Sequence, residues 1–348
     1  MKRASAAVAV SAGIIALAAC TDATGVDRSS AASSGLTTSF SQDVTPDDAK
    51  EKKIAFMPTK NGIPQAQKES SKSRPGTGTG IYYHGGPVLQ AGTNVVAIYW
   101  ASGRIYNSAP LPAVLPTAHG PGSGDVSLIG DFLRGLGGSL YFGINSTYKD
   151  GAGIPIQNSV TYTAYWANAA NAPGPSQTVS DAQMIAMLQS GFNSGALTYD
   201  PSTLYLIFSA STANLGGGFG SQYCGYHTHG TVTVSGVSRT ALYSAMPYDY
   251  AYPGVCTNGT AAANGTLDPG ADGEVSVLAH EIEETTTDMM GNAWYDSRGY
   301  ENADKCAWNF GTTYTTANRG TANVNLGGKD FLVQQNWKNS GLGGCFMS

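Results

Sequence analysis

One short segment carries the residue types of a metal-dependent enzyme. Residues 279–284 read Ala-His-Glu-Ile-Glu-Glu and contain an H-E-x-x-E sequence. Residues four apart lie on one face of a helix, so His280 and Glu284 can converge on one point, with Glu281 beside them. The H-E-x-x-H sequence uses this geometry to hold zinc while its Glu acts as general base. The spacing therefore predicts a zincin-like helix in which a carboxylate replaces the second imidazole.

A catalytic zinc ion needs a third protein ligand and one open position for water. The segment that begins at Glu301 returns two carboxylates soon after the helix. Glu301 is the first choice for the third ligand and Asp304 the second, the latter as a group that orients His280. In this scheme the metal acidifies a water molecule and Glu281 takes its proton, which predicts a hydrolase.

An excess of acidic residues surrounds this helix. Ten carboxylates fall between Asp268 and Asp304, where Arg298 is the single base. Such an excess repels itself unless a cation is bound or the side chains are solvated, so a solvated surface helix remains the alternative. Asp288 shares the helix face but is expected to cap the helix or to be solvated. Calcium is a weaker expectation than zinc, because residues 268–274 lack the D-x-D-x-D-G spacing.

Two further histidines follow a cysteine. In an extended segment, His227 and His229 lie on one side of the chain and form a further candidate ligand pair. A histidine that hydrogen-bonds a backbone carbonyl beside a disulfide explains the same residues. Cys224 and His227 could also form a thiol nucleophile and its base, but a disulfide at Cys224 would exclude this interpretation.

Composition excludes several classes of protein. The 348 residues include 19 basic and 24 acidic side chains, for a net charge of −5. With only 12% of its residues charged, the chain is too neutral for a nucleic-acid-binding protein, which needs a basic face. The sequence also has no P-loop and no G-x-S-x-G, so we expect no nucleotide partner and no serine hydrolase.

The N-terminus has the pattern of an export signal. Lys2 and Arg3 precede an apolar run that ends in Leu-Ala-Ala-Cys at Cys20, a sequence that looks like a bacterial lipobox. We therefore expect a signal peptide over 1–19, a lipidated Cys20 that anchors the protein to the membrane of the cell envelope, and a polar tether over 20–80. Signal-peptidase cleavage after Ala19 without lipidation is the alternative. Residues 81–348 are expected to form one domain.

Hydrophobic periodicity in that domain predicts both helices and strands. Helices are expected over 125–136, 180–192 and 273–290, the second opened by a capping box of Ser180 and Gln183. Strands are expected over 94–101, 139–148, 160–166, 204–209, 240–246 and 329–334. The sequence therefore predicts an α+β or α/β fold with a mixed sheet and about three helices.

Four cysteines remain after Cys20. An even number in an exported protein favours two disulfides, and of the three pairings we favour Cys224–Cys256 and Cys306–Cys345. We expect these bridges to stabilise the domain.

Several segments together resemble the EXORDIUM, or phosphate-induced, protein family. They are YHGGPVL (83–89), NVVAIYW (94–100), VSVLAHEIEE (275–284), NAWYD (292–296), ENADKC (301–306) and GKDFLVQQNW (328–337). The family's motifs match His280, Glu281, Glu284, Glu301, Asp304 and the four cysteines, with either His227 or His229. The resemblance implies a secreted protein of the cell wall and supports the pairing of Cys306 with Cys345. It does not by itself imply a peptidase.

These observations lead to two hypotheses of different classes. The first is a surface lipoprotein with a zinc-dependent hydrolase site that acts on peptides. The second is a non-catalytic cell-envelope protein that binds cell-wall polysaccharide through its aromatic side chains, with a structural metal or none.

Overall fold

A computed structural model describes residues 54–62, 80–114, 118–216, 218–260 and 268–348. The expected signal peptide, Cys20 and most of the expected tether lie outside these ranges. No helix in the described ranges is both long and apolar enough to cross a membrane.

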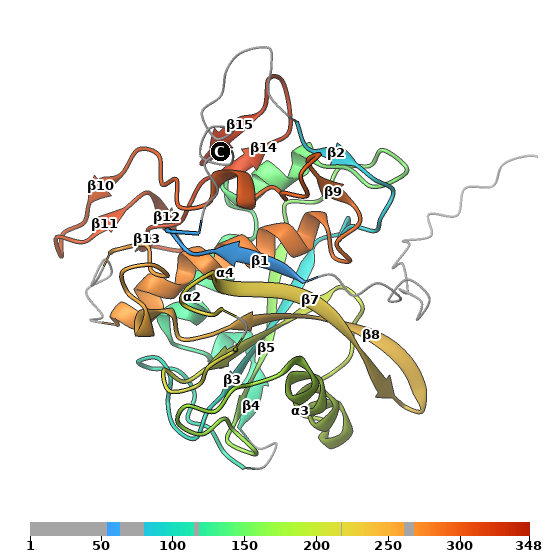
Figure 1. Ribbon diagram of the computed structural model, residues 1–348, viewed down its shortest axis with the longest axis vertical. Coiled ribbons are helices and arrows are strands. Elements are labelled where there is room, and N and C mark those ends of the chain that lie inside the picture. The colour runs from blue at the N-terminus through green and yellow to red at the C-terminus, as the bar shows by residue number, and fades with distance from the viewer. Residues whose placement is uncertain (1–53, 63–79, 115–117, 217, 261–267) are drawn as a thin grey trace, which may run out of the picture. The chain divides into compact units, whose positions relative to one another are not determined.

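A mixed sheet of seven strands forms the centre of the fold (Figure 1). Its middle strands β8, β6, β3 and β5 are parallel, whereas β1 and β7 are antiparallel at one edge and β4 is antiparallel at the other. In sheet order the strands are β1 (Ala55–Pro58), β7 (Tyr223–Val234), β8 (Val237–Met246), β6 (Thr203–Ser209), β3 (Thr93–Trp100), β5 (Val160–Asn168) and β4 (His119–Pro121).

Helices cover both faces of this sheet, and the alternation of side chains along β3 shows how. Val95 and Tyr99 pack in one apolar cluster with α2 (Leu128–Leu136) and α4 (Pro269–Thr287). Val96 and Ile98 pack in the other with α3 (Asp181–Ser194). Successive residues of a strand face opposite sides, so a strand buried on both faces reads as a continuous apolar run. The fold is therefore α+β with three α-helices in the described ranges, as predicted.

The sheet begins inside the segment that the sequence predicts to be a tether. Residues Ala55–Pro58 form β1 and pair with β7, so that Ala55 lies opposite His227. The side chain of Met57 is fully buried, and Trp308 donates a hydrogen bond to the carbonyl of Pro58 at 2.8 Å. A four-residue strand in a polar segment carries too little hydrophobic pattern to be recognised, although its single buried side chain holds it at the edge of the sheet.

Helix α4 begins earlier than the hydrophobic pattern predicts, at Pro269. Asp268 precedes it as N-cap and accepts a hydrogen bond from the Ala271 amide at 3.2 Å. A proline at the first helical position needs no amide partner, so this start is well formed. At the other end, the Asp288 carboxylate accepts hydrogen bonds from the amides of Asn292 and Ala293. The capping role expected for Asp288 is confirmed, and its side chain is buried rather than solvated.

The burial of α4 explains why it could not be recognised as a core element. Every residue of this helix except Pro269 is buried. The large sheet lies on one side of it, and segments from the C-terminal part of the chain lie on the other (Figure 1). Its carboxylates are therefore not the solvated groups of a surface helix, and that alternative interpretation is wrong.

One predicted strand is absent. Residues 142–147 form the 3₁₀-helix η2 (Phe142–Thr147) rather than part of a strand over 139–148. The Ser139 hydroxyl accepts a hydrogen bond from the Phe142 amide, and the hydroxyls of Ser146 and Thr147 donate to carbonyls three residues earlier. Hydroxyl side chains that bond to the local backbone compete with strand pairing.

Short elements complete the domain. Two-stranded pairs are formed by β2 (Tyr82–Tyr83) with β9 (Trp294–Tyr295), β10 (Tyr314–Thr315) with β11 (Thr321–Ala322), β12 (Val324–Leu326) with β13 (Lys329–Phe331), and β14 (Asn336–Lys338) with β15 (Gly344–Phe346). Further 3₁₀-helices are η1 (Gly122–Gly124), η3 (Asp249–Ala251) and η4 (Asp304–Cys306). The disulfides Cys224–Cys256 and Cys306–Cys345 are both present, in the predicted pairing.

Candidate metal centre

The H-E-x-x-E segment lies in the second half of α4, and side chains from two other segments meet it. His227, Glu281 and Glu284 bring one potential ligand atom each within 4.8 Å of one another. His280, Glu284 and Asp304 form a second such group. Glu284 belongs to both, so its carboxylate lies at the centre of the site.

Strand β7 positions His227. Its Nδ1 lies 3.0 Å from Oε2 of Glu281 and 3.6 Å from Oε2 of Glu284, while its Nε2 lies 3.6 Å from Oε2 of Glu301. A methyl group added at Gly225, two residues earlier on the same face, would lie 2.7 Å from Val277 of α4 and collide with it. Glycine at this position therefore lets β7 approach the helix closely enough for His227 to reach its carboxylates.

His229 shares this face of β7 but is not in either group of potential ligands. His229 lies two residues beyond His227 along the strand, a distance of about 6.6 Å at the usual rise per residue. Of the two histidines that the sequence predicts as further ligands, His227 is therefore the one that lies in the cluster.

His280 is oriented by a residue from the C-terminal part of the chain. Its Nδ1 lies 3.3 Å from Oε1 of Gln334, and its Nε2 lies 3.0 Å from Oε1 of Glu284 and 3.7 Å from Oδ1 of Asp304. Because an amide oxygen only accepts hydrogen bonds, the contact with Gln334 places the ring proton on Nδ1 and directs Nε2 at the carboxylates. The Gln334 amide in turn donates to the Ala303 carbonyl at 2.8 Å.

The segment that carries Glu301 and Asp304 returns to α4 as expected. The Asp304 amide donates to Oε1 of Glu284 at 2.9 Å, and the Glu301 amide lies 3.3 Å from Oδ2 of Asp304. Glu301 approaches His227, whereas Asp304 approaches His280. The disulfide Cys306–Cys345 follows directly and ties this segment to β15.

The cluster is almost completely shielded from solvent. The exposed fractions are 0% for His280, Glu281, Glu284 and Glu301, 3% for His227 and 9% for Asp304. Asp304 therefore lies nearest to bulk water.

Burial and charge together perturb the protonation of the site. Although burial alone would lower it, the neighbouring Glu284, Glu281 and Asp304 raise the pKa of His280 to about 10. Burial raises the pKa of Glu281, against the effect of its hydrogen bond with His227. Burial and the nearby Glu284 hold the pKa of Asp304 well above its usual range. Four carboxylates with two imidazoles leave an excess of negative charge, which a bound cation would offset.

Several buried polar atoms of the site lack a hydrogen-bond partner within the described ranges, among them Oε1 of Glu281 and Oε2 of Glu284. Oε1 of Glu281 makes no hydrogen bond within the described part of the chain, while Oε2 of the same carboxylate contacts His227. Buried polar atoms are rarely left in this state unless a ligand, ion or water satisfies them. Nitrogen and oxygen donors at this density are the ligands that zinc accepts, so the residues fit a bound zinc ion.

A second buried network, which no motif in the sequence indicates, lies behind the H-E-x-x-E segment. Glu283 points away from the metal-site face and accepts hydrogen bonds from the side-chain amides of Asn145 and Asn336, the latter at 2.6 Å. Burial raises the pKa of Glu283 well above its ordinary value. This network connects α4 to η2 and β14. The amides lie 138 and 53 residues from Glu283, so spacing along the chain could not identify them.

Cys224 cannot serve as a nucleophile in this structure, because it forms the disulfide with Cys256. This disulfide instead ties β7, three residues before His227, to the segment that follows η3. Two disulfide bonds are typical of an extracellular protein.

Comparison with known proteins gives the family. The conserved region of phosphate-induced protein 1 matches residues 139–335, a range that includes every residue of the candidate metal centre. The protein EXORDIUM-like 3 of Arabidopsis thaliana is 26% identical over 306 residues, which cover 81% of this chain and 88% of the relative. EXORDIUM-like 5 of the same plant is 25% identical over 315 residues, which cover 79% and 80%. No solved structure matches the chain. The chain belongs to the phosphate-induced protein 1, or EXORDIUM, family.

Proposed function

We propose that this protein is a lipid-anchored zinc protein of the cell envelope, and that its α4 site hydrolyses peptide bonds. The observation that carries the proposal is the convergence of His227, from β7, on the H-E-x-x-E helix, with Nδ1 3.0 Å from Glu281. His227 and Glu281 are 54 positions apart in the chain, so the grouping is a product of the fold.

His280 and Glu284 are the proposed principal ligands. His227 and Glu301 are near enough to complete the set, and Asp304 with Gln334 orients His280. Because the pKa of His280 is raised to about 10, both of its ring nitrogens carry a proton near neutral pH when no metal is present, and the ring is positively charged. Zinc binding would displace one of these protons and relieve the repulsion among the carboxylates.

Glu281 is the proposed general base. When bound, zinc lowers the pKa of a coordinated water and polarises a carbonyl group. Glu281 belongs to the His227 group of potential ligands but not to the His280 group, and burial raises its pKa above the ordinary value of a glutamate, which favours a role as a base. Its contact with His227 fixes the carboxylate, and its second oxygen has no partner in the described ranges.

Burial favours a second candidate function. A catalytic zinc site keeps an open position, whereas a structural site is closed by protein ligands. Five of the six residues in the cluster are no more than 3% exposed. In this second account the metal holds β7, α4 and η4 together in a non-catalytic cell-envelope protein, and hydrolysis does not occur.

One pair of variants separates these accounts. Full-length protein in detergent is incubated with a peptide library, and cleavage and zinc content are measured for wild type, Glu281→Gln and Glu283→Gln. The hydrolase account expects Glu281→Gln to retain zinc and lose cleavage by at least about a hundredfold, the usual contribution of a general base. The Glu283→Gln control should retain both, because Glu283 faces Asn145 and Asn336. A wild type that holds stoichiometric zinc and cleaves nothing would leave only the structural role.

A further inference from the structure

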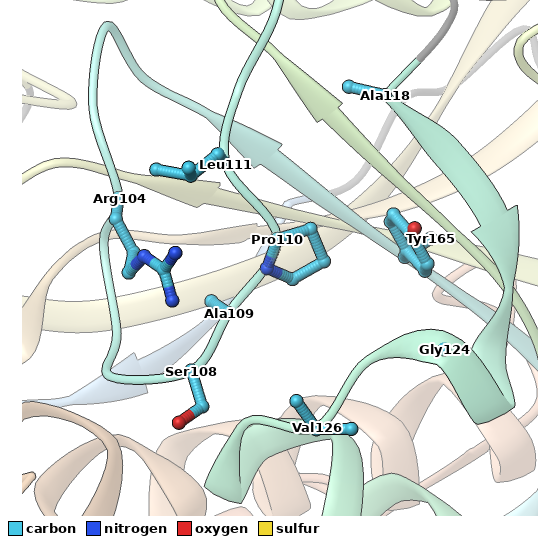
Figure 2. A pocket seen from close by; sticks show the side chains of 9 residues that line it. All are labelled: Arg104, Ser108, Ala109, Pro110, Leu111, Ala118, Gly124, Val126 and Tyr165. Carbon is cyan, nitrogen blue, oxygen red and sulfur yellow. The ribbon is translucent and has the colours of Figure 1, made fainter.

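A cavity of about 460 Å³ lies on the opposite side of the sheet's parallel region from β7, away from the metal centre. Its lining comes from three segments (Figure 2): the loop after β3, the residues between β4 and α2, and Tyr165 of β5. Both β3 and β5 are parallel strands, and the loop leaves β3 at its carboxyl end. Ligands of open α/β sheets bind outside the carboxyl ends of such strands, where neighbouring connections diverge to opposite faces.

The connections do diverge at this point. After β5 the chain passes through α3 and returns as β6 on the other side of β3. The connection between β3 and β5 carries α2, which packs on the face opposite α3. This change of direction places the expected crevice between β3 and β6. The cavity lies on the other side of β3, beside β5, so its lining residues carry the argument. Its volume is in the range of small-molecule sites.

The charge of the lining selects for an anion. Among the described residues that line the cavity, Arg104 is the one charged side chain and none is a carboxylate. Within the part of the chain that the structure describes, Arg104, Ser108 and the Tyr165 hydroxyl make no hydrogen bond or ion pair. Figure 2 shows the guanidinium of Arg104 extending toward Ala109 and Pro110. A guanidinium offers a planar pair of donors that matches a carboxylate.

The rest of the lining is apolar and suits a ring. Pro110, Leu111 and Val126 lie around the cavity, and Leu111 and Val126 are 64% and 67% exposed. A methyl group added at Gly120 or Gly124 would lie 3.1 or 3.2 Å from the Tyr165 ring. Glycine at both positions thus lets the backbone of Gly120 and Gly124 pack against the Tyr165 ring and hold it in the wall of the cavity.

The walls are held in place before any ligand binds. The Asn107 amide donates to Oδ2 of Asp268 at 2.5 Å, and Ser108 adopts a left-handed conformation with φ of 59°. On the facing wall, Arg134 donates to the carbonyls of Gly122 and Asp125 at 2.8 and 2.5 Å. A non-glycine residue in the left-handed region costs free energy, and such strain gathers at functional sites.

We propose that this cavity binds a small carboxylate carried on a six-membered ring, with Arg104 at the carboxylate and Tyr165, Pro110 and Val126 around the ring. An aromatic acid and a uronic acid sugar share this chemistry. The proposal is independent of the metal centre and goes beyond the proposed hydrolase function, so chelation of metal should not change the binding.

The test is titration calorimetry on full-length protein in detergent with benzoate and glucuronate, each beside its uncharged counterpart, benzyl alcohol and glucose. Hydrogen–deuterium exchange locates the bound ligand. We expect at least one acid to bind with a dissociation constant on the order of 1 mM, given the few atoms involved, and to protect the peptides that contain residues 101–114 and 122–128. Benzoate alone would identify an aromatic acid, and glucuronate alone a uronic acid.

Two exposed substitutions test the assignment of residues. Arg104→Gln should weaken the acid about tenfold, the loss of one charge-assisted pair of hydrogen bonds. Val126→Asp, which adds a carboxylate to the lining, should weaken it as well. The control Arg319→Gln, at an exposed arginine in the turn between β10 and β11, should bind as wild type does. The proposal is overturned if neither acid protects these peptides, if the uncharged counterparts bind as tightly, or if Arg104→Gln leaves the affinity unchanged.

Discussion

Nδ1 of His227, in strand β7, lies 3.0 Å from Oε2 of Glu281, in helix α4, although the two residues are 54 positions apart in the chain. The contact joins β7 to the H-E-x-x-E segment at a point where both side chains are buried. It therefore makes the sheet a part of the candidate metal centre, and it distinguishes His227 from its neighbour His229.

The two histidines of β7 should differ in their effect on zinc binding. A metal ion that binds only the folded state stabilises it by about 4 kcal/mol when free zinc is about a thousand times the dissociation constant. His227→Ala should lose at least half of this zinc-dependent stabilisation, measured as the difference between urea unfolding with zinc and with chelator. His229→Ala, an equally buried change on the same face, should keep it. Equal zinc-dependent shifts in the two variants would remove His227 from the site.

The amides around Glu283 should contribute to stability because their partner is buried. Asn336→Leu removes a 2.6 Å hydrogen bond to this buried carboxyl group, which then keeps the Asn145 amide as its remaining side-chain donor in the described ranges. We expect the free energy of unfolding to fall by about 1–3 kcal/mol. Asn325→Leu is the control on an exposed hairpin, where it removes a 2.8 Å hydrogen bond to Asp330 and a 3.2 Å hydrogen bond from the Gly328 amide. Its cost should stay below about 1 kcal/mol, and urea unfolding of both variants measures the difference.

A second buried carboxyl group on α4 should make stability depend on pH. Burial raises the pKa of Glu274 to about 8, so the folded protein keeps this group protonated at pH values where the unfolded chain ionises it. Stability is unaffected below the unfolded pKa near 4.5, falls as pH rises from there to about 8, and is level above. The loss is at most about 1.4 kcal/mol per pH unit for one proton.

The Glu274→Gln variant lacks this titration. Its free energy of unfolding relative to wild type should therefore rise between pH 5 and pH 8, as measured by urea unfolding at three pH values. Parallel pH profiles for the two proteins would show that Glu274 is ionised in the fold.

Strand β1 should be part of the stable domain rather than of a tether. Met57 extends from β1 into the core and is fully buried, so Met57→Ala leaves a cavity. The free energy of unfolding should fall by about 2–4 kcal/mol. Leu140→Ala is the control, because Leu140 is 78% exposed and its truncation should cost less than about 0.5 kcal/mol. Thermal unfolding that is the same for Met57→Ala and wild type would place β1 outside the cooperative unit.

Local signals in the sequence predicted local structure well. Ser180 and Gln183 form the predicted capping box at the start of α3, with both reciprocal hydrogen bonds present. The apolar run of β3 and the H-E-x-x-E helix were also recognisable, since caps and periodicity act over a few residues. The resemblance of six short segments was enough to identify the family.

Properties that depend on distant segments were not predictable in this way. The burial of α4 on all sides leaves its apolar residues without a single stripe, so its pattern does not show which face is covered. Gln334 reaches His280 from 54 positions away, and nothing in the residues around it indicates that contact. Ser139, which begins a predicted strand, instead bonds to its own backbone neighbourhood, because a hydroxyl offers the chain an alternative to pairing.

The most direct test of the metal centre is the zinc content of the full-length protein, measured by inductively coupled plasma mass spectrometry beside His280→Ala, Glu284→Ala and the surface control His84→Ala. The account predicts about one zinc ion per chain in wild type and in the control, and almost none in the other two variants. A folded wild type with both disulfides intact and no transition metal would contradict it.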